Sequence, residues 1–405
     1  MNSRSIATLC GTAILAACQD SPVPVAPAVA VTSIVIPYEI VDLGTLGGAF
    51  AMADQINALG HVAGRSQNTA GEYRAFLWDG SVMQDLGPVI FNCGRCGDRV
   101  RLNDNDQVAW TGPTTDGSTH AFLWDNGAVT DLGTLGGTFS RAAALNNLGQ
   151  VVGTSAVDST SSHAFLWQDG VMTDLGTLGG ASSGATAIND NGQIVGTSTL
   201  AAGSSLEHAF LWQDGAMTDL GSLGGRSSAV AINKAGWIVG ESWTGTSWPP
   251  SYAVLWRGGE MINLGTLPGD LFSTSVAVNA HGEIAGISYK YDSGDYRDPF
   301  VWKARVLMPL DPAYPRHYWQ HVAAMNDDGV VVGHRYVNSH AHQGTVWEAD
   351  GVGQDLGTLG GEQSDAIDIN TSGMLVGWAS TESGETHAVL WRPGRIAPPV
   401  VAANR

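Results

Sequence analysis

The chain has little charge, and least of all positive charge. Among its 405 residues, 14% are charged, and 19 Lys and Arg stand against 38 Asp and Glu, for a formal net charge of −19 at pH 7. An acidic surface repels nucleic-acid phosphates, so we expect no DNA or RNA partner. The sequence also lacks long helical periodicity, a Ser-His-Asp or Cys-His arrangement, and a Gly-x-Ser-x-Gly phrase in a strand-to-helix turn. We therefore expect no cofactor, and an enzymatic role has no direct support.

Long hydrophobic runs are absent too, and the one apolar stretch stands at the N-terminus. Arg4 supplies a minimal positive region, and Ile6 to Leu15 form an apolar run that is too short to anchor in a bilayer. We predict a signal peptide over residues 1–17. It ends in Leu15-Ala16-Ala17-Cys18, which resembles a bacterial lipobox. The resemblance implies that Cys18 becomes the lipidated N-terminus after cleavage.

Lipidation would hold the protein at the cell envelope. Gln19 follows the cysteine where an Asp would suggest inner-membrane retention in some bacteria, so the outer membrane or cell surface is favoured. Residues 18–37 are interpreted as the lipidated cysteine and an extended Pro-rich tether. Removing residues 1–17 takes away one Arg, which leaves 18 basic and 38 acidic residues and a net charge of −20. The alternative is an ordinary secretory signal with an incidental cysteine, and hence a secreted protein.

Cysteine is scarce, with four in the chain. Cleavage of the predicted signal peptide would remove Cys10, and Cys18 is the predicted lipid site. Cys93 and Cys96 stand in Asn-Cys-Gly-Arg-Cys-Gly, and in an exported protein such a pair predicts a short-loop disulfide. A zinc site would need two further ligands nearby, and a thioredoxin-like redox role would need a βαβ context that is missing.

Glycine is plentiful, with 53 residues, and it recurs within a repeated unit of about 44 residues. The phrases Asp-Leu-Gly-Thr-Leu-Gly-Gly and His-Ala-Phe-Leu-Trp mark the unit. Eight copies are aligned by a Trp, which is Trp78, Trp124, Trp167, Trp212, Trp256, Trp302, Trp347 and Trp391. An Asn leads each copy at Asn57, Asn103, Asn146, Asn189, Asn233, Asn279, Asn326 and Asn370.

One unit contains four predicted strands. In the third copy these cover residues 141–146, 150–155, 163–167 and 171–176. The turn Asn146-Asn147-Leu148-Gly149 suits a type I turn, and Asp169-Gly170 suits a two-residue hairpin that needs positive φ. Four antiparallel strands per unit are typical of a propeller blade, with an open β-solenoid as the alternative.

The chain ends favour a closed ring. The last copy stops after three strands, at Trp391, and an unpartnered strand over residues 38–44 precedes the first copy. The N-terminal strand can therefore complete the last blade, and closure removes exposed sheet edges. We predict an all-β fold, a closed propeller of eight four-stranded blades over residues 38–396, followed by a C-terminal tail over 397–405. If the repeats are miscounted, the ring has seven or nine blades instead.

The repeat phrases His-Ala-Phe-Leu-Trp, Asp-Leu-Gly-Thr-Leu-Gly-Gly and Ala-Ile-Asn-x-x-Gly-x-Val-Val-Gly resemble the HAF family of probable extracellular repeats. The resemblance covers residues 38–391 and recurs with little decay in copies three and four. It implies an exported location. It brings no assigned activity and no catalytic residues.

The loops of a blade sort onto two faces. The Asn-x-x-Gly and Asp-Gly turns are short and nearly identical among copies, whereas the second-to-third loops and the blade-to-blade links vary and share the opposite face. Variable loops on a rigid scaffold usually carry binding, so we predict that this variable face is functional. Its aromatic residues gather in copies five to seven, and the candidate binding residues are Trp243, Trp248, Tyr289, Tyr291, Tyr314, Tyr318, Trp319 and Tyr336.

Exposed aromatic rings among polar residues suit stacking on sugars or gripping of peptides. The alternative is that these rings pack on one another and stiffen long loops. The same region holds five histidines, which form a candidate transition-metal site: His317, His321, His334, His340 and His342. Against that site, the sequence places no evident carboxylate or cysteine to complete the ligand set. An oxygen-rich turn at Asn103-Asp104-Asn105-Asp106 suggests calcium less strongly, because it reads as a turn variant.

The histidines at the repeated strand start and the acids of the Asp-Leu-Gly phrase recur at equivalent positions, which predicts a structural role. Only four acids near the aromatic residues stand out as catalytic candidates, namely Asp292, Asp295, Asp298 and Asp311. The favoured hypothesis is an envelope-anchored, non-catalytic protein that binds glycan or protein and meets the membrane through its lipid anchor alone. The alternatives are a glycosidase or lyase using the same region, and a structural envelope protein without a specific ligand. The oligomeric state cannot be read from the sequence.

Overall fold

The computed structural model describes residues 36–90, 99–245, 250–290, 296–314, 319–339 and 341–394, all within one compact unit, Val35–Arg405. The predicted signal peptide, the lipid site Cys18, and the predicted disulfide Cys93 and Cys96 lie outside these residues. Every regular element in the described part is a β-strand. The same part contains no helix with the length and hydropathy needed to span a membrane.

The described residues contain thirty-two strands, which form eight blades of four strands each. Six blades are separate sheets, and blades 1 and 8 are joined by one parallel bridge between Phe50 and Thr386. Blade 1 contains β2 (Gly47–Ile56), β3 (Val62–Asn68), β4 (Tyr73–Trp78) and β5 (Met83–Pro88). Blade 2 contains β6 (Arg101–Leu102), β7 (Val108–Pro113), β8 (Thr119–Asp125) and β9 (Ala128–Asp131). Blade 3 contains β10 (Ser140–Leu145), β11 (Val151–Ala156), β12 (Ser162–Gln168) and β13 (Val171–Asp174). Blade 4 contains β14 (Ser183–Ile188), β15 (Ile194–Thr199), β16 (Glu207–Gln213) and β17 (Ala216–Asp219).

The second half of the ring repeats this pattern. Blade 5 contains β18 (Ser227–Ile232), β19 (Ile238–Trp243), β20 (Ser251–Arg257) and β21 (Glu260–Gly265). Blade 6 contains β22 (Phe272–Val278), β23 (Ile284–Lys290), β24 (Tyr296–Lys303) and β25 (Val306–Pro309). Blade 7 contains β26 (Gln320–Met325), β27 (Val331–Tyr336), β28 (His342–Trp347) and β29 (Gly353–Asp355). Blade 8 contains β30 (Gly360–Ile369), β31 (Leu375–Thr381), β32 (Thr386–Pro393) and, from the other end of the chain, β1 (Tyr38–Gly44).

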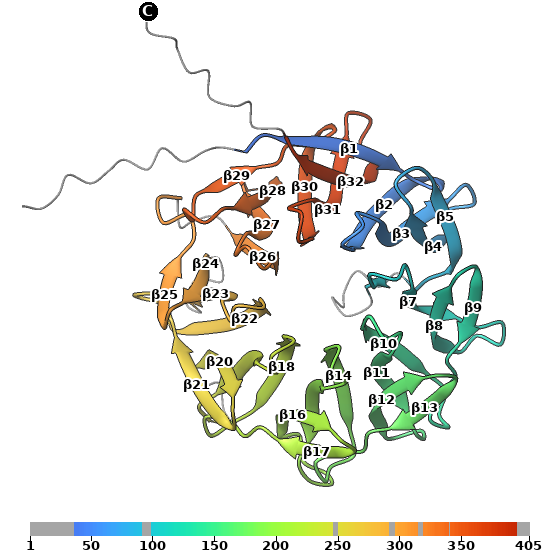
Figure 1. Ribbon diagram of the computed structural model, residues 1–405, viewed down its shortest axis with the longest axis vertical. Coiled ribbons are helices and arrows are strands. Elements are labelled where there is room, and N and C mark those ends of the chain that lie inside the picture. The colour runs from blue at the N-terminus through green and yellow to red at the C-terminus, as the bar shows by residue number, and fades with distance from the viewer. Residues whose placement is uncertain are drawn as a thin grey trace, which may run out of the picture. The chain divides into compact units, whose positions relative to one another are not determined.

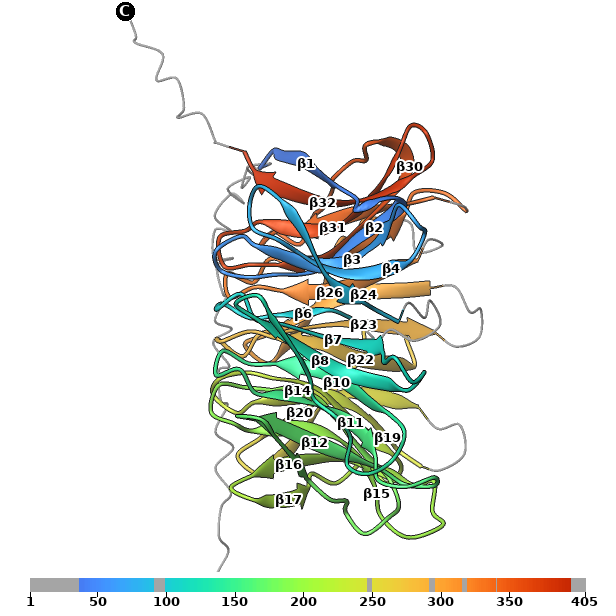
Figure 2. The same cartoon turned by 90° about the vertical axis from the view of Figure 1, so that its right-hand side faces the viewer.

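The blades are arranged around a central axis, with the first strand of each blade innermost and the fourth strand at the rim (Figure 1). Seen edge-on, the loops gather on two faces (Figure 2). The predicted closure is confirmed, because β1 pairs antiparallel with β32 from Tyr38 opposite Pro393 to Gly44 opposite Ala388. The predicted strands of the third copy differ from β10 to β13 by at most two residues at an end.

A ring of asparagine side chains follows the inner strands and explains why the Asn leads every copy. Asn146 Nδ2 donates to the backbone carbonyl of Asn189 at 3.1 Å, and Asn189 donates to Asn233 at 2.9 Å. The same contact joins each blade to the next, and the eighth runs from Asn370 back to Asn57 at 3.0 Å. Each buried amide thus satisfies a buried carbonyl of its neighbour, and the series closes on itself.

The Asp-Leu-Gly-Thr-Leu-Gly-Gly phrase builds the link between blades. Between blades 2 and 3, Asp131 accepts the Gly133 amide at 2.9 Å, and Gly133 takes a φ of +72°, which only glycine adopts freely. Leu132 lies buried between the blades. Thr134 Oγ1 then donates to the Gly137 carbonyl at 2.9 Å, which turns the chain inward to start the next blade.

The core sits between neighbouring blades rather than within one. Between blades 3 and 4, for example, Val152 and Leu175 pack with Ile194 and Phe210. Within each blade, the glycine of the second strand allows a close approach of the first strand. A Cβ on Gly153 would lie 1.8 Å from the Arg141 carbonyl oxygen of β10, where the register shifts between Ala142 and Ala144. Backbone this close at a bulge leaves no room for a side chain.

Candidate functional site

The variable face carries a repeated His–Asp pair at the rim of four of the eight blades, namely blades 2, 3, 4 and 8. Each pair joins the His of the third strand to the Asp of the fourth strand or its equivalent. The Nδ1 to carboxylate distances are 2.8 Å for His120–Asp131 and 2.9 Å for His163–Asp174, His208–Asp219 and His387–Asp42. In blade 1, Arg74 replaces the histidine and lies 3.0 Å from Asp85. The repeat acids and histidines therefore have partners of their own, as their equivalent positions predicted.

Blades 5 to 7 depart from this pair. Blade 5 has Tyr252 and Asn263 at the two positions, and blade 6 has Asp298 and Pro309. In blade 7, Gln343 replaces the histidine, and the acid Asp355 is bound by Arg335 Nε at 2.8 Å. The repeat is broken at the blades where the sequence placed the candidate site.

A pocket of about 300 Å³ opens at the link between blades 6 and 7. Its walls include Leu267, Pro268, Leu310 and Pro312, and its polar groups are Asp298, Asp311 and the Tyr314 ring. Two of the four acids predicted as catalytic candidates, Asp298 and Asp311, thus line one cavity, with 8% and 9% of their surface exposed. The other two, Asp292 and Asp295, lie outside the described residues.

Arg335 holds two residues of the pocket lining, Asp311 and Tyr314, in place. Its guanidinium pairs with Asp311 and Asp355, and it lies over the Tyr314 ring at 4.4 Å from the centroid. The Tyr314 hydroxyl donates to the Tyr336 carbonyl at 2.8 Å. Burial raises the pKa of the Asp311 carboxyl, although the neighbouring Arg335 acts in the opposite direction. These contacts fix one face of the Tyr314 ring and one edge of the pocket.

The predicted aromatic residues only partly come together. Tyr314, Trp319 and Tyr336 gather in blade 7, where the ring centroids of Trp319 and Tyr336 are 6.3 Å apart. Trp319 is the most open of them, with 36% of its surface exposed, and the Arg297 guanidinium lies 4.7 Å from its centroid.

Trp243 and Tyr289 belong instead to separate blades. Tyr289 stacks on Phe272 at 5.4 Å, and Trp243 is half-buried at the end of β19. Tyr289 therefore fits the alternative prediction, in which the aromatic rings pack on one another. The candidates Trp248, Tyr291 and Tyr318 lie outside the described residues.

Three of the five predicted metal-ligating histidines are neighbours in blade 7. The rings of His321 and His334 stack at 5.1 Å, and those of His334 and His342 are 4.5 Å apart. His317 and His340 lie outside the described residues. Burial lowers the pKa of His321 to about 4 and that of His342 to about 4. Both imidazoles are therefore neutral at neutral pH.

The expectation that no carboxylate completes this set was wrong. Asp365, on β30 of blade 8, lies 3.0 Å from His334 Nδ1. Sequence reasoning missed it because the contact crosses from one blade to the next, between residues 31 positions apart. In the ring, the second strand of one blade packs on the first strand of the following blade, as β27 does on β30.

The acids of the oxygen-rich turn of blade 2 contact the corresponding turn of blade 1. Asp104 accepts the Ala58 amide at 2.9 Å, and Asp106 accepts the Asn57 side-chain amide at 2.8 Å and contacts His61 at 2.7 Å. Asp106 takes a φ of +62° at the position where the other copies have a glycine, so the segment is a variant of the repeat turn, as predicted.

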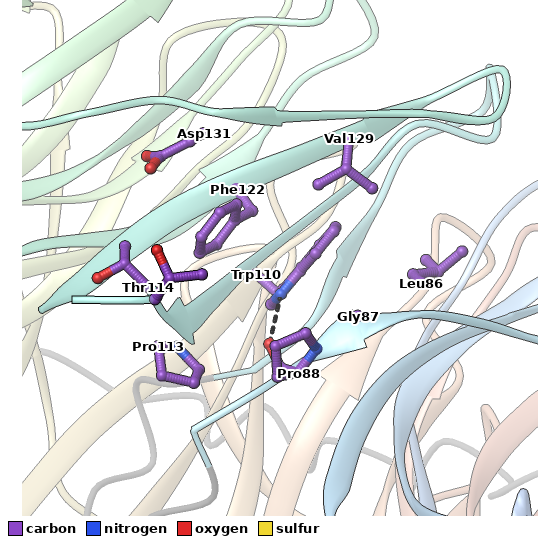
Figure 3. Close-up of a pocket in the computed structure, with 10 residues that line it drawn as sticks. Leu86, Gly87, Pro88, Trp110, Pro113, Thr114, Phe122, Val129 and Asp131 are labelled. Atoms are coloured by element: carbon purple, nitrogen blue, oxygen red, sulfur yellow. Dashed lines mark hydrogen bonds between the residues drawn. The ribbon is translucent and has the colours of Figure 1, made fainter. Parts of the chain in front are cut away.

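A second pocket, of about 250 Å³, was not predicted and lies between blades 1 and 2 (Figure 3). Trp110 and Phe122 stack in its wall at 5.6 Å, and Trp110 Nε1 donates to the Pro88 carbonyl at 3.0 Å. Trp110 occupies the position that is glycine in the other blades. It fits because β6 is only two residues long and does not extend opposite it. The signal in the sequence was this replacement of the repeat glycine by Trp.

No protein-family model matches the chain, and no curated protein matches it either. Among solved structures, the β-propeller domain of the Trilobed protease from Pyrococcus furiosus aligns at 9% identity and a TM-score of 0.49, over 87% of this chain and 98% of that one. A puromycin-hydrolyzing peptidase from Mycobacterium tuberculosis aligns at 13% identity and 0.48, over 73% and 52%. The acylaminoacyl peptidase of Pyrococcus horikoshii aligns at 10% and 0.48, over 84% and 51%. The chain spans about half the length of these two peptidases, and similarities this weak carry no argument about activity.

Proposed function

We propose that the protein is an exported carbohydrate-binding propeller without catalytic activity, which takes a sugar residue into the pocket at the link between blades 6 and 7. The observation that carries the proposal is that Asp298, Asp311 and the Tyr314 ring line one cavity beside blade 6, which is one of the blades that lack the rim His–Asp pair. Small-ligand pockets typically combine apolar walls with a few placed polar groups. Here the walls are leucine and proline side chains, and the polar groups are acceptors.

The chemistry of the pocket suits a polyhydroxylated ligand. Buried carboxylates accept hydrogen bonds from hydroxyl groups strongly, because charge-assisted bonds are shorter and stronger than neutral ones. An aromatic ring offers a surface on which the C–H face of a sugar ring can stack. A cavity of about 300 Å³ lies at the lower end of the range for small-ligand sites, which suits one sugar unit of a longer glycan.

Export and anchoring are part of the same proposal. They are supported by the apolar run before Cys18, by the lipobox resemblance and by the resemblance of the repeats to HAF proteins. Lipidation of Cys18 would tether the propeller to the cell envelope through the Pro-rich segment. The variable face would then be free to meet glycans of the envelope or of its surroundings.

The test is a glycan array probed with the wild-type protein, with Asp298→Asn and with Asp158→Asn. Asp158 is an exposed acid on the plain blade 3 loop of the same face, so it controls for general loss of negative charge. We expect the wild type and Asp158→Asn to bind the same glycans and Asp298→Asn to lose at least tenfold in affinity. Binding that Asp298→Asn retains in full would remove the pocket from the proposal. No glycan bound by the wild type would reject the carbohydrate-binding function.

A second candidate, a glycosidase or lyase, is favoured by one observation. Asp298 and Asp311 line the same cavity, and burial raises the pKa of Asp311, as a general acid requires. The pairing of Asp311 with Arg335 argues the other way, because a cation at the carboxylate holds it ionised. Incubating each bound glycan with the protein and measuring new reducing ends distinguishes the two candidates. Release that Asp311→Asn abolishes would favour the enzyme.

A further inference from the structure

The junction between blades 7 and 8 holds a group of ligating side chains that the carbohydrate proposal does not use. His334 comes from β27, His342 from β28 and Asp365 from β30. One ligand atom from each side chain lies within 4.8 Å of the other two. The side chains of His334 and Asp365 are 17% and 20% exposed, so the group is partly enclosed and still reachable from solvent.

We propose that His334, His342 and Asp365 form a binding site for a divalent transition metal, with Zn²⁺ the ion that fits best. Two imidazoles and one carboxylate are a ligand set that Zn²⁺ commonly takes, with a water in the fourth position. Ligand atoms around a tetrahedral zinc lie about 3.4 Å apart, given bonds of about 2.1 Å. Small side-chain rotations would bring the three atoms to that spacing, and the His334–Asp365 hydrogen bond would give way to two coordinate bonds.

The repeat does not account for this cluster. At the position of His334, the other blades have Arg65, Thr111, Thr154, Thr197, Glu241, Ile287 and Trp378. At the position of His342, they have Tyr73, Thr119, Ser162, Glu207, Ser251, Arg297 and Thr386. At the position of Asp365, the described blades have Met52, Arg141, Gly184, Ser228, Thr274 and His321. Three departures from the repeat therefore converge on one blade junction, two of them to histidine.

The surroundings hold the ligands in place. His321 stacks on His334 with an interplanar angle of 17°, and its buried Nδ1 has no hydrogen-bond partner among the described residues. The Trp378 ring contacts His342 edge-on at 5.6 Å, and the Tyr336 ring lies 5.2 Å from it. Rings packed on both sides restrict the rotation of the imidazoles. Restriction of this kind favours metal binding, because less conformational entropy is lost when the ion arrives.

The placement also indicates what the metal does. Two ligands belong to blade 7 and one belongs to blade 8, so the ion would join neighbouring blades. An ion that binds the folded state alone stabilises it in proportion to its concentration and affinity. The site therefore ties two blades together next to the variable loops of blade 7, and it does so whether or not the nearby pocket binds carbohydrate.

The test is calorimetric titration of the metal-free, untagged protein with ZnCl₂, together with its melting temperature in ZnCl₂ and in EDTA. We expect one Zn²⁺ per chain with a dissociation constant in the micromolar range or below. At about 100 times that constant, Zn²⁺ should raise the melting temperature by about 3 °C. Asp365→Asn and His342→Gln should each weaken binding at least tenfold and remove the shift.

The matched control is His208→Asn, which removes an imidazole that also contacts a carboxylate at 2.9 Å but belongs to no group of three possible metal ligands among the described residues. Its Zn²⁺ affinity should equal that of the wild type. Cobalt gives an independent readout on the wild type, since Co²⁺ in a four-coordinate site absorbs strongly in the visible range. Absence of saturable Zn²⁺ binding and of the Co²⁺ band in the wild type overturns the proposal. Wild-type affinity in both Asp365→Asn and His342→Gln also overturns it.

Discussion

His387 Nδ1 lies 2.9 Å from the carboxylate of Asp42, although 345 residues separate the two along the chain. This pair repeats the His–Asp contact that blades 2, 3 and 4 each make within a single repeat. The N-terminal strand β1 thus supplies the last blade with its fourth strand and with the specific acid that this strand carries elsewhere. The ring is closed by the same interactions that build its blades.

Removing β1 should open the ring and destabilise it. The strand packs Val41 and Leu43 against one core cluster and Tyr38 and Ile40 against another. We expect deletion of residues 1–44 to cost about 4 kcal/mol of unfolding free energy, from the loss of four partly buried side chains. Deletion of residues 1–36, which keeps β1, is the matched control and should leave the urea midpoint unchanged. Equal midpoints for the two deletions would show that β1 does not close the ring.

The second-strand glycine should be intolerant of any side chain. In blade 3 a Cβ at Gly153 would lie 1.8 Å from the Arg141 carbonyl oxygen, so Gly153→Ala must push two strands apart. We expect a loss of about 3 kcal/mol or more. Gly203→Ala is the control, because Gly203 has open space around it and only its φ of +75° resists substitution, at a cost of about 1 kcal/mol. Similar losses in the two variants, measured by chemical denaturation, would contradict this reading of the packing.

Glu241 should make the protein less stable as the pH rises through the weakly acidic range. Burial raises the pKa of Glu241 to about 7 from 4.5. Below pH 4.5 the side chain is protonated in both states and has no effect. Between pH 4.5 and 7 the unfolded chain loses this proton while the folded chain keeps it, so folding stability falls.

Glu241→Gln removes this titration and keeps the shape of the side chain. We expect the variant to exceed the wild type by on the order of 2 kcal/mol at pH 8 and to match it at pH 4. The difference between the two proteins, taken from urea denaturation at several pH values, isolates this group from others that titrate. A difference that stays constant from pH 4 to pH 8 would show that burial does not raise the pKa of Glu241.

Lipidation of Cys18 predicts a simple chemical difference. In a bacterial host, the wild-type protein should incorporate a labelled fatty acid and partition into the detergent phase of Triton X-114. Cys18→Ser should do neither, because a hydroxyl at this position cannot form the thioether to the lipid. Cys10→Ser is the control, since Cys10 lies in the segment that cleavage removes, and it should behave as the wild type does. Labelling of Cys18→Ser would place the lipid elsewhere or remove the anchor from the proposal.

The sequence predicted the scaffold well because each blade repeats the same local signals. The Asn146-x-x-Gly149 turn, the Asp169-Gly170 hairpin and the alternation of the third strand recur, so the eight copies support one another. Both central residues of the hairpin take positive φ, +52° at Asp169 and +85° at Gly170. Closure of the ring could be predicted because an unpartnered strand over residues 38–44 precedes the first copy, whereas the last copy has only three strands.

The candidate site was harder to predict, because its contacts cross from blade to blade. Asp365 joins the histidines through strands of two blades, and no spacing along the chain reveals that contact. Trp243 and Tyr289 looked like members of one aromatic group, but they stand at the ends of second strands in different blades, β19 and β23. The sequence pattern predicted that both residues lie on the variable face, but in the propeller they belong to blades 5 and 6 and do not form one group. Only Tyr314, Trp319 and Tyr336 gather where the sequence suggested.

The claim that a carbohydrate occupies the pocket at the link between blades 6 and 7 is tested most directly by hydrogen–deuterium exchange with and without the glycan that binds best on the array. We predict slower exchange in the three segments that line the pocket, residues 264–272, 296–303 and 306–314, and unchanged exchange in the blade 3 loop over residues 156–162. Protection confined to any other part of the ring, or no protection at saturating glycan, would contradict the proposed site.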